Sequence, residues 1–283
     1  MQQDPALAAV KTYRYLRVAL VALVVLLFAA VVIEWWRTGR SCLQPSISAY
    51  VHTPVQSVFV GVLVAMGVGL IALQGSTRAE TVLLNVAGML APGVAFIPST
   101  DVGTCRSAPT TLAEVPARVA TSMGALFVVG ALAGVFAAVL AVREHRAGRG
   151  HRSDLLGIVG STVLLGGGAV WYAVGRTSFL EHAHGFAAVP MFLAFVAVVA
   201  LNARDARSET LGASGSRGPR RYVRVYGVIA VLMLLALGVA VVMSLVARSS
   251  HVVFWTEVVL ILLFAVFWAV QTVELWSRGL RRS

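Results

Sequence analysis

The feature that most constrains this chain is a series of long apolar runs, each of about 16 to 23 residues, that recurs along its 283 residues. About 20 apolar residues in a helix cross the hydrocarbon core of a membrane. In lipid, every backbone polar group has to be bonded within its own segment, which favours helices. Only 12% of the residues are charged, about half the share of a soluble domain. The sequence therefore predicts an all-α, polytopic transmembrane helix bundle, with residues 1–283 forming a single integral membrane domain.

Eight membrane spans are expected, with an error of a few residues at each boundary. The first apolar run continues into "IEWWRTGR" without a small-residue cleavage site, so we interpret it as a retained helix and not as a signal peptide. The expected spans are 15–36, 55–74, 80–98, 117–142, 154–175, 183–203, 222–247 and 252–276.

The distribution of basic residues predicts the orientation. With both termini in the cytoplasm, the inner segments hold 17 of the 23 Lys and Arg residues, and the outer segments hold 6. Cytoplasmic loops are enriched in basic residues, so this ratio favours an N-in, C-in protein of the cell (plasma) membrane. It also explains the net charge of +11 without a nucleic-acid partner. Anionic-lipid binding by the Arg-rich segment 204–224 is the alternative interpretation.

Arginine accounts for all but one of the basic residues, since Lys11 is the only lysine. This bias is typical of a GC-rich bacterial genome, and it carries no information about mechanism.

In this orientation, uncharged polar and ionisable side chains gather at the outer face. Glu257 lies about one and a half turns into the last span, where an ionisable group is costly and usually faces the bundle or a wet cavity. A carboxylate that snorkels to the interface is the alternative. The expected outer-face polar pocket comprises Ser46, Ser48, Tyr50, His52, Asn85, Asp101, His182, His184 and Glu257.

The two cysteines, Cys42 and Cys105, fall in the first and second outer loops. In an oxidising compartment this placement predicts a disulfide, with two unpaired thiols as the alternative.

Known catalytic motifs are absent from the sequence, so no catalytic residue is assigned and no cofactor is expected. A zinc site formed by His52, His182, His184 and Asp101 is a weaker alternative. The two histidines of "HAH" point apart on a helix, so they chelate well only in a loop or strand. Interfacial histidines that bond to loop carbonyls or lipid headgroups are the simpler interpretation.

Short motifs in the chain resemble the Frag1/DRAM/Sfk1 group of membrane proteins. The resemblance is carried by "PSISAY" (45–50), "VFVG" (58–61), "NVAG" (85–88), a histidine that opens a later span, and "TE" (256–257). The group has six spans and is linked to lipid remodelling and lipid organisation, so the resemblance implies a lipid-facing role. The spans near 117–142 and 154–175 are additional to that pattern.

The function expected from these observations is non-enzymatic binding or organisation of lipid at the outer leaflet, with membrane lipids as partners. Three alternatives remain open: a structural or assembly subunit of a larger membrane complex, a metal-dependent hydrolase that uses the outer-face His and Asp residues, and a transporter.

Overall fold

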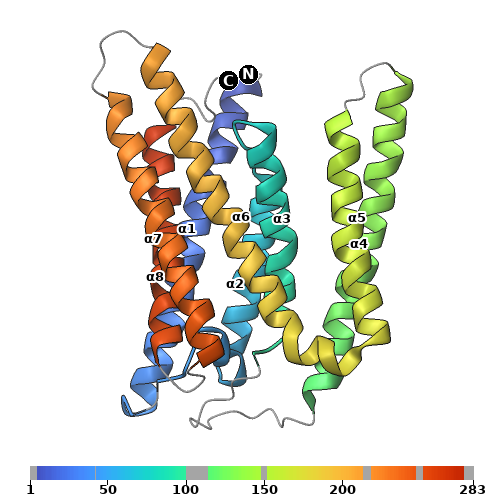
Figure 1. Cartoon of the computed structure of the whole chain (residues 1–283), viewed down its shortest axis with the longest axis vertical. Helices are drawn as coiled ribbons and strands as arrows, with labels where there is room; N and C mark the ends of the chain where they lie inside the picture. Colours follow the sequence, from blue (N-terminus) through green and yellow to red (C-terminus); the bar gives the residue numbers. More distant parts are fainter. Residues whose placement is uncertain are drawn as a thin grey trace.

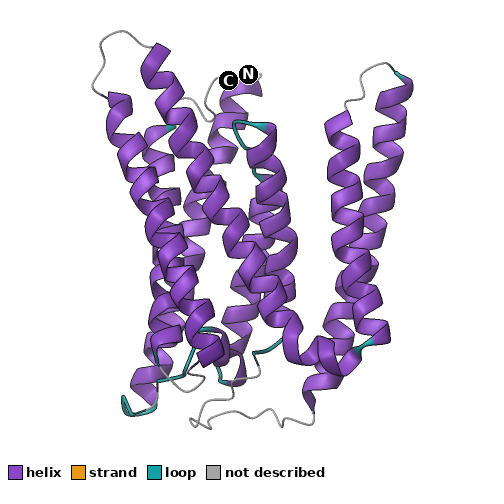
Figure 2. Ribbon diagram, in the orientation of Figure 1, coloured by secondary structure: helices purple, strands orange, loops and turns teal. Residues whose placement is uncertain are grey.

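The computed structural model describes residues 5–41, 43–99, 114–147, 152–212, 218–246 and 251–276, and eight α-helices run through them. Helices are the regular structure drawn in this part of the chain (Figure 2). Their bounds are α1 Pro5–Arg37, α2 Gln56–Ala72, α3 Arg78–Phe96, α4 Val115–Arg146, α5 Arg152–Val174, α6 Arg176–Gly212, α7 Gly218–Val246 and α8 Val252–Glu274, with a short 3-10 helix η1 at Ser48–His52.

Seven of these helices are long and apolar enough to cross a membrane, so the chain is a multi-pass membrane protein. The exception is α2, which has 17 residues. At 1.5 Å per residue it is about 26 Å long, slightly short of the roughly 30 Å hydrocarbon core. The predicted span 55–74 is therefore correct in place but too long, because the chain leaves the helical conformation at Leu73.

Six helices form one packed bundle, in which α1, α2, α3, α6, α7 and α8 surround a continuous apolar core (Figure 1). The start of α1 and the end of α8 lie at one end of this bundle, which is called the terminal end below. The segment that joins α1 to α2 lies at the opposite end, called the loop end.

Helices α4 and α5 form a separate hairpin that packs mainly on itself (Figure 1). It joins the bundle through a small apolar cluster that includes Ile97, Val119 and Phe179, near the loop end. No residue in the most apolar stretch of either hairpin helix is buried within the described chain. This exposure is what a membrane helix shows where it faces lipid or a partner.

Glycines let α2 and α3 approach closely in the bundle. A Cβ atom added to Gly88 would lie 2.6 Å from the carbonyl oxygen of Gly67, and one added to Gly67 would lie 2.6 Å from the carbonyl oxygen of Gly88. Small residues at such crossings are a common solution in membranes, where close backbone packing contributes to helix association. This contact holds the walls of the site described next.

Candidate functional site

The segment between α1 and α2 is an ordered, buried cap on the loop end. Its hydroxyl groups bond to its own backbone: Ser46 Oγ accepts a hydrogen bond from the Ala49 amide at 3.0 Å, and Thr53 Oγ1 accepts one from the Val55 amide at 3.2 Å. The hydroxyl groups of Ser46 and Ser48 also lie 3.2 Å apart. Local bonds of this kind satisfy loop backbone without a buried charge. The uncharged polar composition of this loop therefore has a structural explanation.

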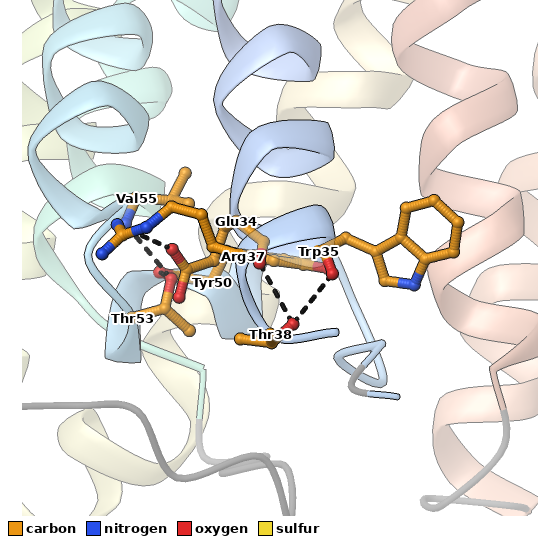
Figure 3. A network of polar contacts seen from close by, with 7 residues as sticks. All are labelled: Glu34, Trp35, Arg37, Thr38, Tyr50, Thr53 and Val55. Atoms are coloured by element: carbon orange, nitrogen blue, oxygen red, sulfur yellow. Dashed lines mark hydrogen bonds and ion pairs between the residues drawn. The ribbon is translucent and has the colours of Figure 1, made fainter. Parts of the chain in front are cut away.

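Figure 3 shows Glu34 of α1 and Tyr50 of the cap in one network of polar contacts. Glu34, near the end of α1, is 6% exposed and forms an ion pair with Arg37 at 3.5 Å. Tyr50 is buried, and burial raises the pKa of its phenol above the usual value near 10. Its ring packs against Phe254 of α8, with 6.3 Å between ring centroids. The Tyr50 ring thereby packs the cap against the last helix.

Glu257 on α8 bonds directly to the cap. The Ile47 amide donates a hydrogen bond to Glu257 Oε2 at 2.6 Å, and Ser48 Oγ donates a longer one to Oε1 at 3.5 Å. The side chain therefore faces the interior of the bundle and satisfies a loop amide. A carboxylate that accepts a backbone amide makes a charge-assisted bond, which is stronger than a neutral one.

An apolar cavity of about 90 Å³ extends from this carboxylate into the bundle. Its lining includes Phe59 and Leu70 of α2 and His184 and Phe195 of α6, so it follows each of these helices for eleven residues, or about 16 Å. Such a small volume over such a length makes the cavity narrow. Its polar lining residues, Ser48, His184 and Glu257, gather at the loop end.

The expected polar residues converge only in part. Ser48, His184 and Glu257 meet at the cavity, and His184 Nδ1 donates a hydrogen bond to the Ile97 carbonyl at 2.6 Å. His52 Nε2 instead donates to the Ser99 carbonyl at 3.0 Å. Asn85 does not line the cavity, and its Oδ1 atom is buried without a hydrogen-bond partner among the described residues.

The histidine pair does not form the chelating loop that the zinc alternative requires. Helix α6 begins at Arg176, so "HAH" is helical, and the two imidazoles point to different sides. His182 is exposed and bonds to the Ser178 carbonyl of its own helix. Within the described residues, no group of three or more His, Cys, Asp and Glu side chains could hold a metal ion. Asp101, Cys42 and Cys105 lie outside the residues that the structure describes.

A second buried polar cluster lies towards the terminal end and has no counterpart in the sequence-based expectations. Asn202 Nδ2 of α6 donates to Glu80 Oε1 of α3 at 2.8 Å, and Gln271 Nε2 of α8 donates to Asn202 Oδ1 at 2.8 Å. The Ser76 amide donates to Glu80 Oε2 at 2.7 Å, and Thr77 caps α3 by accepting from the Glu80 amide. The spacing of Thr77 and Glu80 is that of a capping box, the one signal that could have placed Glu80 at a helix start.

No family model matches the chain, and neither curated proteins nor solved structures show a significant similarity to it.

Proposed function

We propose that this multi-pass membrane protein binds membrane lipid without chemical turnover, holding one aliphatic chain in the cavity beside Glu257. The observation that carries this proposal is the cavity itself, which is narrow, apolar along about 16 Å, and polar only at the loop end. Ligand sites are typically apolar with a few polar groups that fix orientation. A lipid chain has the matching shape and polarity.

The charge distribution supports a location in the outer leaflet. The cavity's polar end lies at the loop end, which is the outer face if the 17 basic residues of the inner segments are cytoplasmic. A lipid in the outer leaflet would then enter with its polar end level with Glu257 and its chain pointing towards the membrane centre.

The resemblance to the Frag1/DRAM/Sfk1 group supports the same proposal. The "PSIS" and "TE" motifs that carry it contain Ser48 and Glu257, which lie next to each other at the cavity. Six packed helices with a separate α4–α5 hairpin also agree with a six-span arrangement to which two spans have been added.

A role as a subunit of a larger membrane complex is the second candidate, and the hairpin favours it. The most apolar stretches of α4 and α5 are not buried within the described chain, and the hairpin joins the bundle only near one end. Purification in a mild detergent, followed by identification of stoichiometric partners, tests this candidate. Loss of such a partner on deletion of residues 115–174 would assign the hairpin to assembly.

Lipid retention tests the lipid-binding proposal. The protein is purified in detergent, and its bound lipids are identified by native mass spectrometry. Ala188→Leu places three further carbon atoms on a cavity-lining position of α6, and we expect this variant to lose most of the retained lipid. Ala200→Leu makes the same change at an exposed position of the same helix and should retain wild-type levels. Equal retention by the two variants would refute a lipid site in the cavity.

A further inference from the structure

Helix α4 carries a groove in its second half, on the way to its end at the terminal end of the molecule (Figure 1). The groove has a volume of about 390 Å³, and the described residues that line it are Val135, Ala138, Val139, Val142, Arg143 and Arg146. Their spacing alternates between three residues and one, which places them on one face of an α-helix. This face is apolar for about two turns and then ends in two arginines.

The apolar part of the groove is open to the surroundings of the protein. Val135, Val139 and Val142 are exposed. Exposed apolar surface of this kind marks a site of contact with a membrane or a partner. From Val135 to Val142 the helix rises about 10 Å, which lies within the roughly 15 Å of hydrocarbon that one leaflet provides. The chains of a single leaflet can therefore cover this part of the groove.

The two arginines form the polar end of the groove. Arg143 and Arg146 lie in the last turn of α4, both are exposed, and neither forms an ion pair with another described residue. None of the described residues that line the groove is Asp or Glu. Glu144 follows Arg143 in the sequence, but successive residues of a helix point to different sides. The polar end of the groove is therefore positively charged.

This charge favours an anionic headgroup. A guanidinium group presents five hydrogen-bond donors and no acceptor, in a geometry that matches phosphate oxygens. The carboxyl end of a helix carries a partial negative charge, so the backbone of α4 does not attract an anion here and the two side chains have to hold it. A zwitterionic headgroup would bring its own cation towards the arginines. Charge complementarity and the apolar stripe together match a lipid with a negatively charged headgroup.

We propose that the α4 groove binds an anionic phospholipid, with its phosphate on Arg143 and Arg146 and an acyl chain along the valines. This site is separate from the cavity beside Glu257 and does not depend on the function proposed for it. The terminal end is the side that the basic-residue count predicts to be cytoplasmic, so the lipid would come from the inner leaflet. An arginine near an anionic lipid surface contributes about fivefold in affinity, so two predict a preference of roughly thirtyfold over a zwitterionic lipid.

Lipid titration followed by native mass spectrometry tests this preference. Delipidated protein in detergent is titrated with dioleoyl phosphatidylglycerol or dioleoyl phosphatidylcholine, and we expect the wild type to bind the anionic lipid at least tenfold more tightly. The same preference should persist in Ala188→Leu, which fills the cavity beside Glu257. Equal affinity for the two lipids in the wild type would overturn the proposal, and so would loss of the preference in Ala188→Leu. The wild-type comparison needs no variant, so it holds even if a substitution impairs folding.

Paired arginine variants assign the charge selection to the groove. The double change Arg143→Gln and Arg146→Gln should weaken phosphatidylglycerol binding by roughly thirtyfold and change phosphatidylcholine binding by less than about threefold. The matched control is Arg204→Gln with Arg207→Gln, a pair of exposed arginines with the same spacing on α6. The control should change the affinity for either lipid by less than about threefold. Equal losses in the two double variants would show a general attraction to basic surface and would overturn the groove as the site.

A second pair of variants tests the apolar part of the groove. Ala138→Phe fills the groove and keeps both arginines, so it should weaken phosphatidylglycerol binding at least fivefold. Ala133→Phe makes the same change at an exposed position on a different side of α4 and should bind like the wild type. Glycerol phosphate, which lacks an acyl chain, should not displace the lipid at equal concentration. Equal binding by the two phenylalanine variants, or displacement by glycerol phosphate, would overturn a site that holds the lipid chain.

Discussion

Replacing Asn202 with leucine should destabilise the protein by about 1 to 3 kcal/mol. Asn202 is fully buried, donates to Glu80 and accepts from Gln271, so the substitution removes two hydrogen bonds that join α3, α6 and α8. Interhelical bonds within membranes average about 0.6 kcal/mol and reach about 1.7 kcal/mol, which gives this range for two. The buried carboxylate of Glu80 loses a donor, and this places the expected value in the upper half of the range.

The same substitution at Asn85 is the matched control. Asn85 also lies in a membrane helix, but its Oδ1 atom is buried without a partner in the described part of the chain. Asn85→Leu should therefore change the free energy of unfolding by less than about 0.5 kcal/mol or increase it. Leucine at either position adds similar apolar area, so the difference between the variants isolates the hydrogen bonds.

Unfolding by SDS titration in mixed micelles, followed by circular dichroism, measures both changes. In a Gln271→Leu background, Asn202→Leu should cost less than in the wild type, because one of its two bonds is already absent. Equal destabilisation by Asn202→Leu and Asn85→Leu would show that the buried cluster contributes nothing specific, and the reasoning from its geometry would be refuted.

Three further predictions concern packing, orientation and redox state. Gly88→Ala should lower the stability of the protein by about 1 to 3 kcal/mol, because the new Cβ atom would meet the Gly67 carbonyl oxygen. In the control Gly61→Ala on α2, the new Cβ atom meets nothing within 4 Å, so this change should be neutral or stabilising. Thermal unfolding in detergent compares the two variants. Reporter fusions after residues 40, 110, 180 and 250 should all report the outside, and an inside signal at any of them would contradict the predicted orientation. Thiol labelling of unreduced protein should detect neither Cys42 nor Cys105, so equal labelling with and without reductant would rule out the predicted disulfide.

The hydropathy pattern was sufficient to predict the helices, because each apolar run has to form its own backbone hydrogen bonds in lipid. It could not predict that α4 and α5 stand apart, since an apolar face that meets lipid and one that meets a helix have the same composition. It also began the sixth span at residue 183, whereas α6 begins at Arg176, because the polar residues between Arg176 and His184 continue the helix.

Only the part of the candidate site around Glu257 could be predicted from the sequence. Glu257 was the clear case, since a carboxylate that deep in a span requires a partner, and the cap provides one. The cluster of Glu80, Asn202 and Gln271 was missed because its three polar groups come from three different helices that are far apart in the sequence. Only their packing, which joins residues up to 191 positions apart, gives them a common environment.

The bond between Ile47 and Glu257 joins positions 210 residues apart, and this separation has a consequence for biosynthesis. Ribosomes add about 5 to 20 residues per second, so the amide of Ile47 waits on the order of 10 to 40 s before its acceptor is made. The loop that closes the cavity therefore cannot take its final form until the last helix has left the ribosome and entered the membrane. During that interval the nascent chain holds an incomplete bundle, which is when insertion chaperones and membrane proteases have access to it. A chain truncated before α8 would remain in this state permanently and should be cleared by quality control.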